Sequence, residues 1–263
     1  MQNTIEIRQL TTLKELDALQ KVEESVWHMP PTPIHQTYTA LNHGGVLLGA
    51  FDEEKMIGFI YSFAGFDGKE PYLCSHMLGI LYEYRKDGLG MKMKFKQAEI
   101  AEKMGYPMMT WTFDPLESLN AYLNLHKIGA VGAYYKENHY GSMDDGLNQG
   151  LPTDRIQIEW RFNERRSSHA LNFDKAKILL KVNMDGHPII TDTFKDNVDL
   201  TSDGWFVAIP ERFQSIKQKN PQLGKEWRFK TRKVFQSLFL KGFKAVDVIR
   251  DDSNPISYYY FSK

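Results

Sequence analysis

The sequence of 263 residues has one cysteine, Cys74, and no excess of charge of either sign. One cysteine cannot form a disulfide within the chain or a cysteine zinc site, which favours a reducing compartment. Basic and acidic residues each number 33, so we expect no nucleic-acid partner. His28, His35 and His43 are irregularly spaced without an i, i+4 pair, so no metal site is expected.

Long hydrophobic runs are also lacking. The longest nearly uncharged apolar run, Met56 to Phe66, is shorter than the roughly 20 residues that cross a membrane as a helix. The first ten residues alternate, with Glu6 and Arg8 among them, and lack the pattern of a secretion signal. We therefore expect a cytoplasmic protein with no membrane partner.

The hydrophobic pattern of the first 160 residues predicts a mixed α/β fold that is not a doubly wound sheet. The predicted strands are Ile5–Arg8, Val46–Phe51, Met56–Phe66, Tyr72–Leu81, Met108–Phe113, Val131–Lys136 and Arg155–Phe162. The predicted helices are one capped by Thr11 or Thr12 that carries Leu13, Leu16, Leu19 and Val22, then Gln36–Leu41, Leu89–Met104, and one that Asp114-Pro115 starts and that runs to Ile128.

The composition changes at the polar segment Asn163–Ser168, where we predict a boundary between a domain 1–162 and a smaller α/β extension 163–263. The elements predicted for the extension are the strands Ile178–Val182, Trp205–Ile209, Ala245–Ile249 and Ser257–Phe261 and the helix Lys225–Lys241. The helix has an apolar stripe that includes Trp227 and Leu238, which favours a core role. We interpret the extension as a packing element or as the interface of a homodimer.

The turn from Arg85 to Gly90 is the candidate functional site. The residues from Arg85 to Gly90 place the pattern Arg-x-x-Gly-x-Gly between a predicted strand and a predicted helix. Glycines allow backbone N–H groups to converge, and a helix start adds free N–H groups and a positive dipole end. Such a turn can bind a diphosphate. The alternative is an ordinary turn before an amphipathic helix.

The turn and the order of the elements resemble the GNAT acyltransferase superfamily over roughly residues 1 to 160. Arg85, Gly88 and Gly90 match its phosphate-binding motif, whereas Tyr82 stands where the family often has proline. The resemblance implies a mostly antiparallel mixed sheet whose fourth and fifth strands splay apart. It also implies acetyl-CoA or another acyl-CoA as co-substrate, and no metal.

A second GNAT-like motif follows the fifth strand, from Asn120 to Ala130. Ala121, Lys127 and Gly129 align with the family pattern. Leu125 stands where many members have a tyrosine that can protonate the leaving thiolate.

By this resemblance, specific residues would hold the coenzyme. Leu78 and Ile80 would offer backbone groups to pantetheine and to the thioester oxygen, and Asn120 and Asn124 would contact pantetheine amides. The residues that would hold the diphosphate are Arg85, Lys86, Asp87, Gly88, Leu89 and Gly90.

His76 is the candidate general base. It precedes Arg85 by nine residues, as does a strand histidine in the similar arylalkylamine N-acetyltransferases, and strand alternation would place it on one face with Leu78 and Ile80. A histidine titrates near pH 6.5 and is suited to this role. The alternative is a hydrogen-bonded core histidine. Cys74 would allow an acyl-enzyme route, but a free cysteine is more typical of a small buried apolar residue.

The general acid and the acceptor site are less defined. Tyr134 and Tyr140 are candidate proton donors, and the thiolate could also leave unaided. Arg155 is the candidate clamp for a substrate carboxylate; the alternative is a structural salt bridge to Asp154 or Glu159.

The sequence therefore predicts an N-acyltransferase that moves an acetyl or succinyl group directly from acyl-CoA to the amine of a small molecule such as an amino acid. Two alternatives remain: a protein or peptide N-acetyltransferase, and a catalytically silent acyl-CoA-binding sensor.

Overall fold

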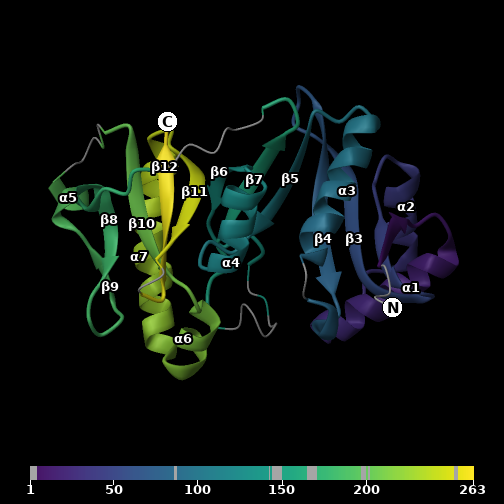
Figure 1. Ribbon diagram of the computed structural model, residues 1–263, viewed down its shortest axis with the longest axis horizontal. Helices are drawn as coiled ribbons and strands as arrows, with labels where there is room; N and C mark the ends of the chain where they lie inside the picture. Colours follow the sequence, from purple (N-terminus) through teal and green to yellow (C-terminus); the bar gives the residue numbers. More distant parts are fainter. Residues whose placement is uncertain are drawn as a thin grey trace. The chain divides into compact units, whose positions relative to one another are not determined.

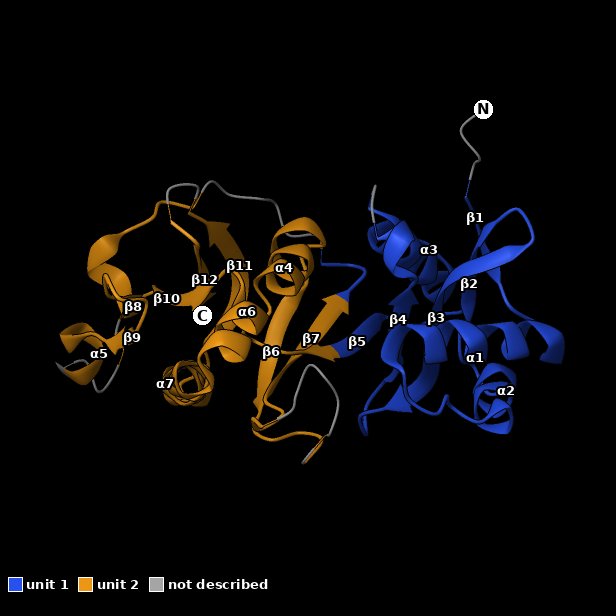
Figure 2. Cartoon of the chain, turned by 90° about the horizontal axis from the view of Figure 1, so that it is seen from below, with its two compact units in different colours: residues 1–111, 161–164 blue, residues 112–160, 165–263 orange. Residues whose placement is uncertain are grey.

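The computed structural model describes residues 5–85, 88–141, 143, 150–164, 171–196, 200, 202–251 and 254–263. The elements are labelled in Figure 1. The chain forms two compact units (Figure 2). Unit 1 comprises residues 1–111 and 161–164, and unit 2 comprises residues 112–160 and 165–263.

Unit 1 is a sheet of strands in the order β1-β2-β3-β4-β5 with three helices. Its elements are β1 (Glu6–Gln9), α1 (Leu13–Trp27), α2 (Ile34–Asn42), β2 (Leu48–Asp52), β3 (Lys55–Phe66), β4 (Pro71–Ile80), a 3₁₀ turn (Tyr82–Tyr84), α3 (Leu89–Lys103) and β5 (Met108–Phe113), whose last two residues belong to unit 2. The strands from β1 to β4 are antiparallel, whereas β4 and β5 are parallel. Each predicted strand and α3 lie within two residues of their predicted limits.

Helix α1 shows how the sequence builds this unit. Thr12 caps it, and the Glu15 carboxylate accepts hydrogen bonds from the Thr11 and Thr12 N–H groups, which completes a capping box. The buried face of α1 includes Leu16 and Leu19, which pack into a core with aromatic residues of β3. Each such buried leucine contributes roughly 1.5–3 kcal/mol through loss of apolar surface.

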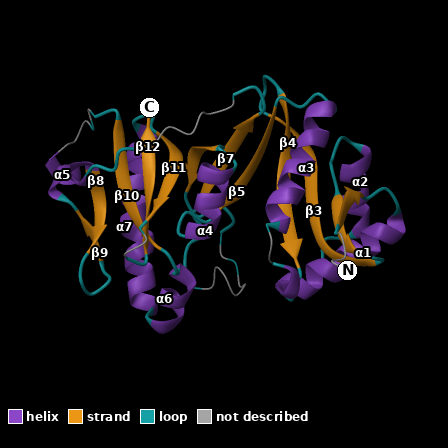
Figure 3. Ribbon diagram, in the orientation of Figure 1, coloured by secondary structure: helices purple, strands orange, loops and turns teal. Residues whose placement is uncertain are grey.

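Unit 2 contains the sheet order β7-β6-β11-β12-β10-β8-β9. Figure 3 shows strands in orange and helices in purple. Its elements are α4 (Ser118–Ala121), a π-helical segment (Tyr122–Lys127), β6 (Val131–Lys136), β7 (Arg155–Arg161), a 3₁₀ turn (Lys175–Lys177), β8 (Ile178–Val182), β9 (Pro188–Ile190), α5 (Asp192–Asp196), β10 (Gly204–Pro210), α6 (Phe213–Lys219), α7 (Pro221–Leu240), β11 (Lys244–Arg250) and β12 (Ile256–Ser262). Only β8 and β10 pair in parallel among the register pairs of the described residues in this unit.

The predicted helix from Asp114 to Ile128 starts later than expected. Asp114 instead forms a turn, because its carboxylate accepts a hydrogen bond from the Leu116 N–H at 2.8 Å. The α-helix begins at Ser118 and gives way to the π-helical segment at Tyr122. The short elements β9, α5 and α6 were not predicted, because three to seven residues carry too little periodic signal.

Helix α7 forms the core of unit 2, as its apolar stripe indicates. Trp227, Val234 and Leu238 are fully buried, and the helix contacts β6, β8, β9 and β10. Residues on both sides of the predicted boundary at 162–163 share this unit: the Tyr259 hydroxyl donates to the Pro115 carbonyl at 2.8 Å. The boundary itself stays a prediction, and residues 165–168 of the polar segment lie outside the described residues.

Among the described residues, no helix is both long and apolar enough to cross a membrane.

Candidate functional site

The turn after β4 ends in an uncapped helix start. Gly88 is the N-cap residue of α3 and has no side chain to cap the helix. The first helical bond that we observe runs from the Lys92 N–H to the Gly88 carbonyl at 3.0 Å. The N–H groups of the first turn therefore have no acceptor within the helix, and the positive end of the helix dipole lies here. Lys86 and Asp87 lie outside the described residues.

The two motif glycines serve different purposes. Gly88 has φ of 69° and ψ of 23°, a left-handed conformation that disfavours other residues. A Cβ atom on Gly90 would instead lie 3.5 Å from Ile80 Cδ1 and 3.7 Å from Leu78 Cδ2, which are ordinary contacts. The backbone conformation thus requires glycine at position 88 and tolerates alanine at position 90.

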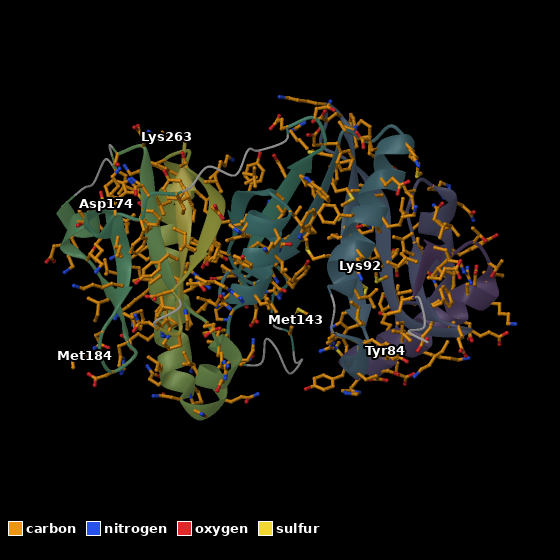
Figure 4. The ribbon with its side chains drawn as sticks, in the orientation of Figure 1. Tyr84, Lys92, Met143, Asp174, Met184 and Lys263 are labelled. Atoms are coloured by element: carbon orange, nitrogen blue, oxygen red, sulfur yellow. The ribbon has the colours of Figure 1, made fainter. Side chains whose placement is uncertain are left out.

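Side chains around the turn tie it to the sheet. The Arg85 Nε donates to the Ile80 carbonyl at 2.9 Å, and the guanidinium carbon lies 5.8 Å from the centre of the exposed Tyr82 ring. The Tyr84 hydroxyl donates to the Asp52 carboxylate on β2 at 2.9 Å. Figure 4 labels Tyr84 and, within α3, Lys92, which flank the turn.

Strand β4 has an unpaired edge. Register pairs join β4 to β5 only at Leu73–Met109 and Cys74–Thr110 among the described residues, so the predicted splay of the fourth and fifth strands is confirmed. The Leu81 N–H bonds to the Ile57 carbonyl of β3 at 2.9 Å. Because backbone groups alternate between the two edges of a strand, those of Leu78 and Ile80 point away from β3. The free edge thus presents the N–H and carbonyl groups of Leu78 and the N–H group of Ile80, whose carbonyl accepts from Arg85.

The predicted face of His76 is wrong, because β4 contains a bulge. Tyr61 pairs with Met77 and the next residue of β3 pairs with Ser75, so His76 is the extra residue. Leu78 and Ile80 lie near Gly90 of α3, whereas the His76 ring lies near Tyr61 on the opposite face. Simple alternation of side chains cannot hold across a bulge.

The bulge gives His76 a setting that suits a base. Its side chain is exposed, and its ring centre lies 5.9 Å from that of Tyr61 and 5.7 Å from that of Phe63. Partial desolvation beside these rings lowers the pKa of His76 below its usual value of 6.5. The imidazole is therefore neutral at pH 7 and able to accept a proton. This environment does not fit a hydrogen-bonded core histidine.

Cys74 is poorly suited to covalent catalysis. Burial raises the pKa of its thiol, although the Thr110 side chain and the nearby Lys94 act in the opposite direction. The thiolate, which is the nucleophilic form, is thus scarce at neutral pH. This chemistry favours direct transfer over an acyl-enzyme.

A buried polar cluster on α3 was not predicted. The Lys94 side chain, 7% exposed, donates from Nζ to Ser75 Oγ at 2.6 Å, and Nζ lies 4.1 Å from the centre of the Trp111 ring. The Ser75 hydroxyl donates to Gln97 Oε1 at 2.8 Å. Desolvation lowers the pKa of Lys94 to about 7. Helical spacing could have revealed this cluster, since Lys94 and Gln97 are four residues before the buried Ala98 and Ala101.

Tyr140 and Arg155 lie together in unit 2. The Tyr140 hydroxyl shares a hydrogen bond of 2.9 Å with Thr112 Oγ1, and the Arg155 guanidinium carbon lies 5.3 Å from the Tyr140 ring centre. Arg155 also donates to the Asp154 carbonyl at 2.8 Å and pairs with the Asp114 carboxylate at 3.8 Å. A cation with an aromatic neighbour can hold a carboxylate, although part of this charge is already balanced.

The other tyrosines near β6 differ in availability. Tyr134 is 48% exposed, and the Lys244 Nζ lies 4.5 Å from its ring centre. The Tyr135 hydroxyl instead donates to the buried Asp154 carboxylate, and burial raises its pKa above the usual value. Tyr135 is thus a structural residue, whereas Tyr134 has an accessible hydroxyl-bearing ring.

The second motif lies on α4 and the π-helical segment of unit 2. Asn120 is exposed, whereas Asn124 is 8% exposed. The backbone carbonyl of Asn124 accepts a hydrogen bond from the Ala130 N–H at 3.1 Å. Leu125 is buried and leaves this segment without the usual tyrosine. The predicted site residues therefore divide between units: His76, Leu78, Ile80 and the turn belong to unit 1, whereas Asn120, Asn124, Tyr134, Tyr140 and Arg155 belong to unit 2.

Metal ligands do not gather anywhere in the part of the chain that the structure describes: it contains no group of three His, Cys, Asp or Glu side chains that could hold an ion.

Comparison with known proteins identifies the fold. No protein-family model matches the sequence, and no curated protein matches it. Among solved structures, the chain is similar to the ribosomal-protein-S18-alanine N-acetyltransferase from Escherichia coli, with 16% identity over 64% of this chain and 100% of that chain and a TM-score of 0.50.

Two further solved structures are similar at lower TM-scores. They are Arabidopsis thaliana NAA60 in complex with a bisubstrate analogue (13% identity, 61% of this chain, 100% of that chain, TM-score 0.49) and an acetyltransferase of the GNAT family from Streptococcus pneumoniae (18%, 60%, 99% and 0.47). Identities this low carry information on the fold alone. The similarity to the Escherichia coli enzyme shows that this chain has the fold of the GNAT acetyltransferases, so the predicted fold is confirmed.

Proposed function

We propose that this protein is an acyl-CoA-dependent N-acyltransferase that moves an acetyl or succinyl group directly to the amine of a small molecule. The observation that carries the proposal is the free edge of β4, which begins beside the bulge at His76 and leads to the uncapped start of α3. Backbone donors, a base and an anion-binding helix start thus follow one another along a single strand and turn.

The coenzyme would bind along this edge. The N–H groups of the first turn of α3 would hold the diphosphate, together with Arg85 and with Lys86 and Asp87 of the same turn. Pantetheine would take the place of a neighbouring strand beside Leu78 and Ile80. The Leu78 N–H is a fixed donor that would stabilise negative charge on the thioester oxygen. Asn120 and Asn124 are the proposed contacts of the pantetheine amides.

The chemistry is a direct displacement. The amine nitrogen attacks the thioester carbonyl carbon, the N–C bond forms, and the C–S bond breaks with release of the CoA thiolate. His76, neutral at pH 7, would accept the proton that the amine loses. Tyr140 or Tyr134 would return a proton to the thiolate in place of the tyrosine that Leu125 replaces. Without such a donor the thiolate leaves unaided.

The acceptor we favour is an amino acid. Arg155, beside the Tyr140 ring, would hold its carboxylate. The α-amine of an amino acid is less basic than a lysine side chain, so it needs less help from a base at neutral pH.

A protein amino terminus is the second candidate acceptor. The solved structure with a TM-score of 0.50 is by its name an acetyltransferase of the alanine of a ribosomal protein. An N-terminal peptide amine, with a pKa near 8, is less basic than the α-amine of a free amino acid, whose carboxylate stabilises the ammonium form. Trials with both acceptor classes therefore distinguish the two.

The test is a matrix of acyl-CoAs against free amino acids and short peptides, scored for release of CoA thiol. Wild type should release thiol with at least one amine, and His76→Ala should lower that rate at least tenfold while CoA affinity is retained. Binding of CoA without thiol release for any amine would instead favour the silent sensor. Absence of CoA binding would remove the proposal.

A further inference from the structure

The point where β4 and β5 part holds a buried lysine, Lys94, that forms no ion pair with a carboxylate of the described residues. Cys74 and Thr110 form the last register pair between the strands, and Ser75 and Trp111 are the next residue of each. Lys94 reaches this point from α3: its Nζ donates to Ser75 Oγ and lies over the Trp111 ring. All of these residues belong to unit 1.

The cluster has an excess of hydrogen-bond donors. A lysine ammonium has three N–H donors, and the side-chain amide of glutamine has two. The Ser75 hydroxyl oxygen is the acceptor of Lys94, whereas the Nε2 of the fully buried Gln97 has no partner among the described residues. Within the described chain, no carboxylate pairs with Lys94 at 4.0 Å or less. Buried charges are normally paired, and buried donors are normally bonded.

An anion would complete this cluster. A carboxylate has two oxygens that can accept hydrogen bonds from several N–H donors. Its negative charge would balance the positive charge of the ammonium. The interaction would be strong because water is excluded from the site.

The proposed coenzyme orientation brings an acyl group to this point. The diphosphate lies at the turn that follows β4, and pantetheine then runs back along the free edge past Ile80 and Leu78. The free edge ends at Ser75, because the two preceding residues of β4, Leu73 and Cys74, pair with β5. The acyl group is at the far end of pantetheine from the diphosphate and therefore reaches the end of this edge, where Lys94 lies.

We propose that Lys94, with Gln97, binds a carboxylate at the end of the acyl chain, so that the preferred donor is a short dicarboxylic acyl-CoA such as succinyl-CoA rather than acetyl-CoA. This inference rests on the proposed function and specifies its acyl donor. The reaction is the same displacement, in which the distal carboxylate stays ionised and takes no part in bond changes.

The test measures binding of four compounds to the full-length protein by calorimetric titration: CoA, acetyl-CoA, butyryl-CoA and succinyl-CoA. Butyryl-CoA has a four-carbon acyl chain like that of succinyl-CoA but no carboxylate, so it separates charge from chain length. We expect wild type to bind succinyl-CoA at least tenfold more tightly than butyryl-CoA or acetyl-CoA.

Two variants make the assignment specific. Lys94→Met keeps the length of the side chain and removes its charge, and it should reduce the preference for succinyl-CoA at least tenfold without changing the affinity for CoA. Lys103→Met removes an exposed lysine of the same helix and should keep the preference of wild type. If wild type binds CoA but shows no preference for succinyl-CoA, or if Lys94→Met keeps the preference, this inference alone is overturned. If wild type binds no CoA, the proposed function is overturned with it.

Discussion

At the scale of single residues, His76 shows how a local irregularity creates chemistry. The bulge places the ring beside Tyr61 and Phe63, where it is partly desolvated yet still exposed. A regular strand would have placed the ring on the side of Leu78 and Ile80, against α3. The partly desolvated, neutral imidazole is therefore a product of one extra residue in β4.

The pH dependence of the reaction should reflect the lowered pKa of His76. With the acceptor held constant, the acid limb of kcat/KM for wild type should include a group with a pKa below 6.5, because desolvation disfavours the charged imidazole. His76→Gln should lose this limb and retain the limb set by the amine. An identical profile for the variant would remove His76 from the mechanism.

The burial of Lys94 should make the stability of the protein depend on pH. The pKa of Lys94 is about 7 in the folded chain, whereas an ordinary lysine has a pKa of 10.5, so between these values the unfolded chain holds one more proton. The free energy of unfolding should therefore rise with pH across this window, by at most about 1.4 kcal/mol per pH unit. Below pH 7 the destabilisation caused by burying the charged Lys94 is fully present.

Denaturant unfolding of the ligand-free protein between pH 6.5 and 9 measures this effect. Lys94→Met should be more stable than wild type at pH 6.5, and the difference should shrink as the pH rises. Lys103→Met controls for the loss of an exposed lysine. A difference between wild type and Lys94→Met that does not change with pH would contradict the buried-cation interpretation.

At the scale of elements, the junction of β4 and α3 depends on one glycine more than on the other. Gly88→Ala should destabilise the protein by about 1 kcal/mol, because a Cβ atom strains the left-handed conformation. Gly90→Ala should be neutral or stabilising by about 0.5–1 kcal/mol, because position 90 is helical and the added Cβ makes ordinary contacts. Thermal and denaturant unfolding of the two variants measure the difference; equal losses would show that backbone conformation is not the cause.

At the scale of the whole molecule, the C-terminal part completes a buried ionic network. Arg232 of α7 bonds to the fully buried Asp154 carboxylate at 2.8 and 2.7 Å, and Arg228 pairs with Asp114. Removal of one partner of a buried pair costs roughly 3–5 kcal/mol. Residues 112–160 therefore depend on residues that follow the predicted boundary.

A fragment of residues 1–162 tests this dependence. We expect it to lack the cooperative thermal transition of the full chain, because Asp154 and Asp114 lose their arginines. Co-expression with residues 163–263 should restore a soluble complex with that transition. A cooperative transition of the isolated fragment would show that the predicted boundary separates independently folding domains.

The sequence alone determined most elements and the position of the glycine-containing turn between β4 and α3. Periodicity located the strands from β1 to β7 and helix α3, because hydrophobic alternation is set by which face is buried. These features are local, so residues close together in the chain suffice to specify them.

Only the tertiary structure decided the face of His76, the late start of α4 and the burial of Lys94. The bulge is a mismatch between two strands, and neither strand reveals it by itself. Asp114 forms a turn while Arg228, distant in the chain, pairs with its carboxylate. Lys94 is charged in any local analysis, and its lowered pKa arises because β4, β5 and α3 together exclude water from it. Each of these features depends on contacts between separate elements, which the order of residues in any one element does not contain.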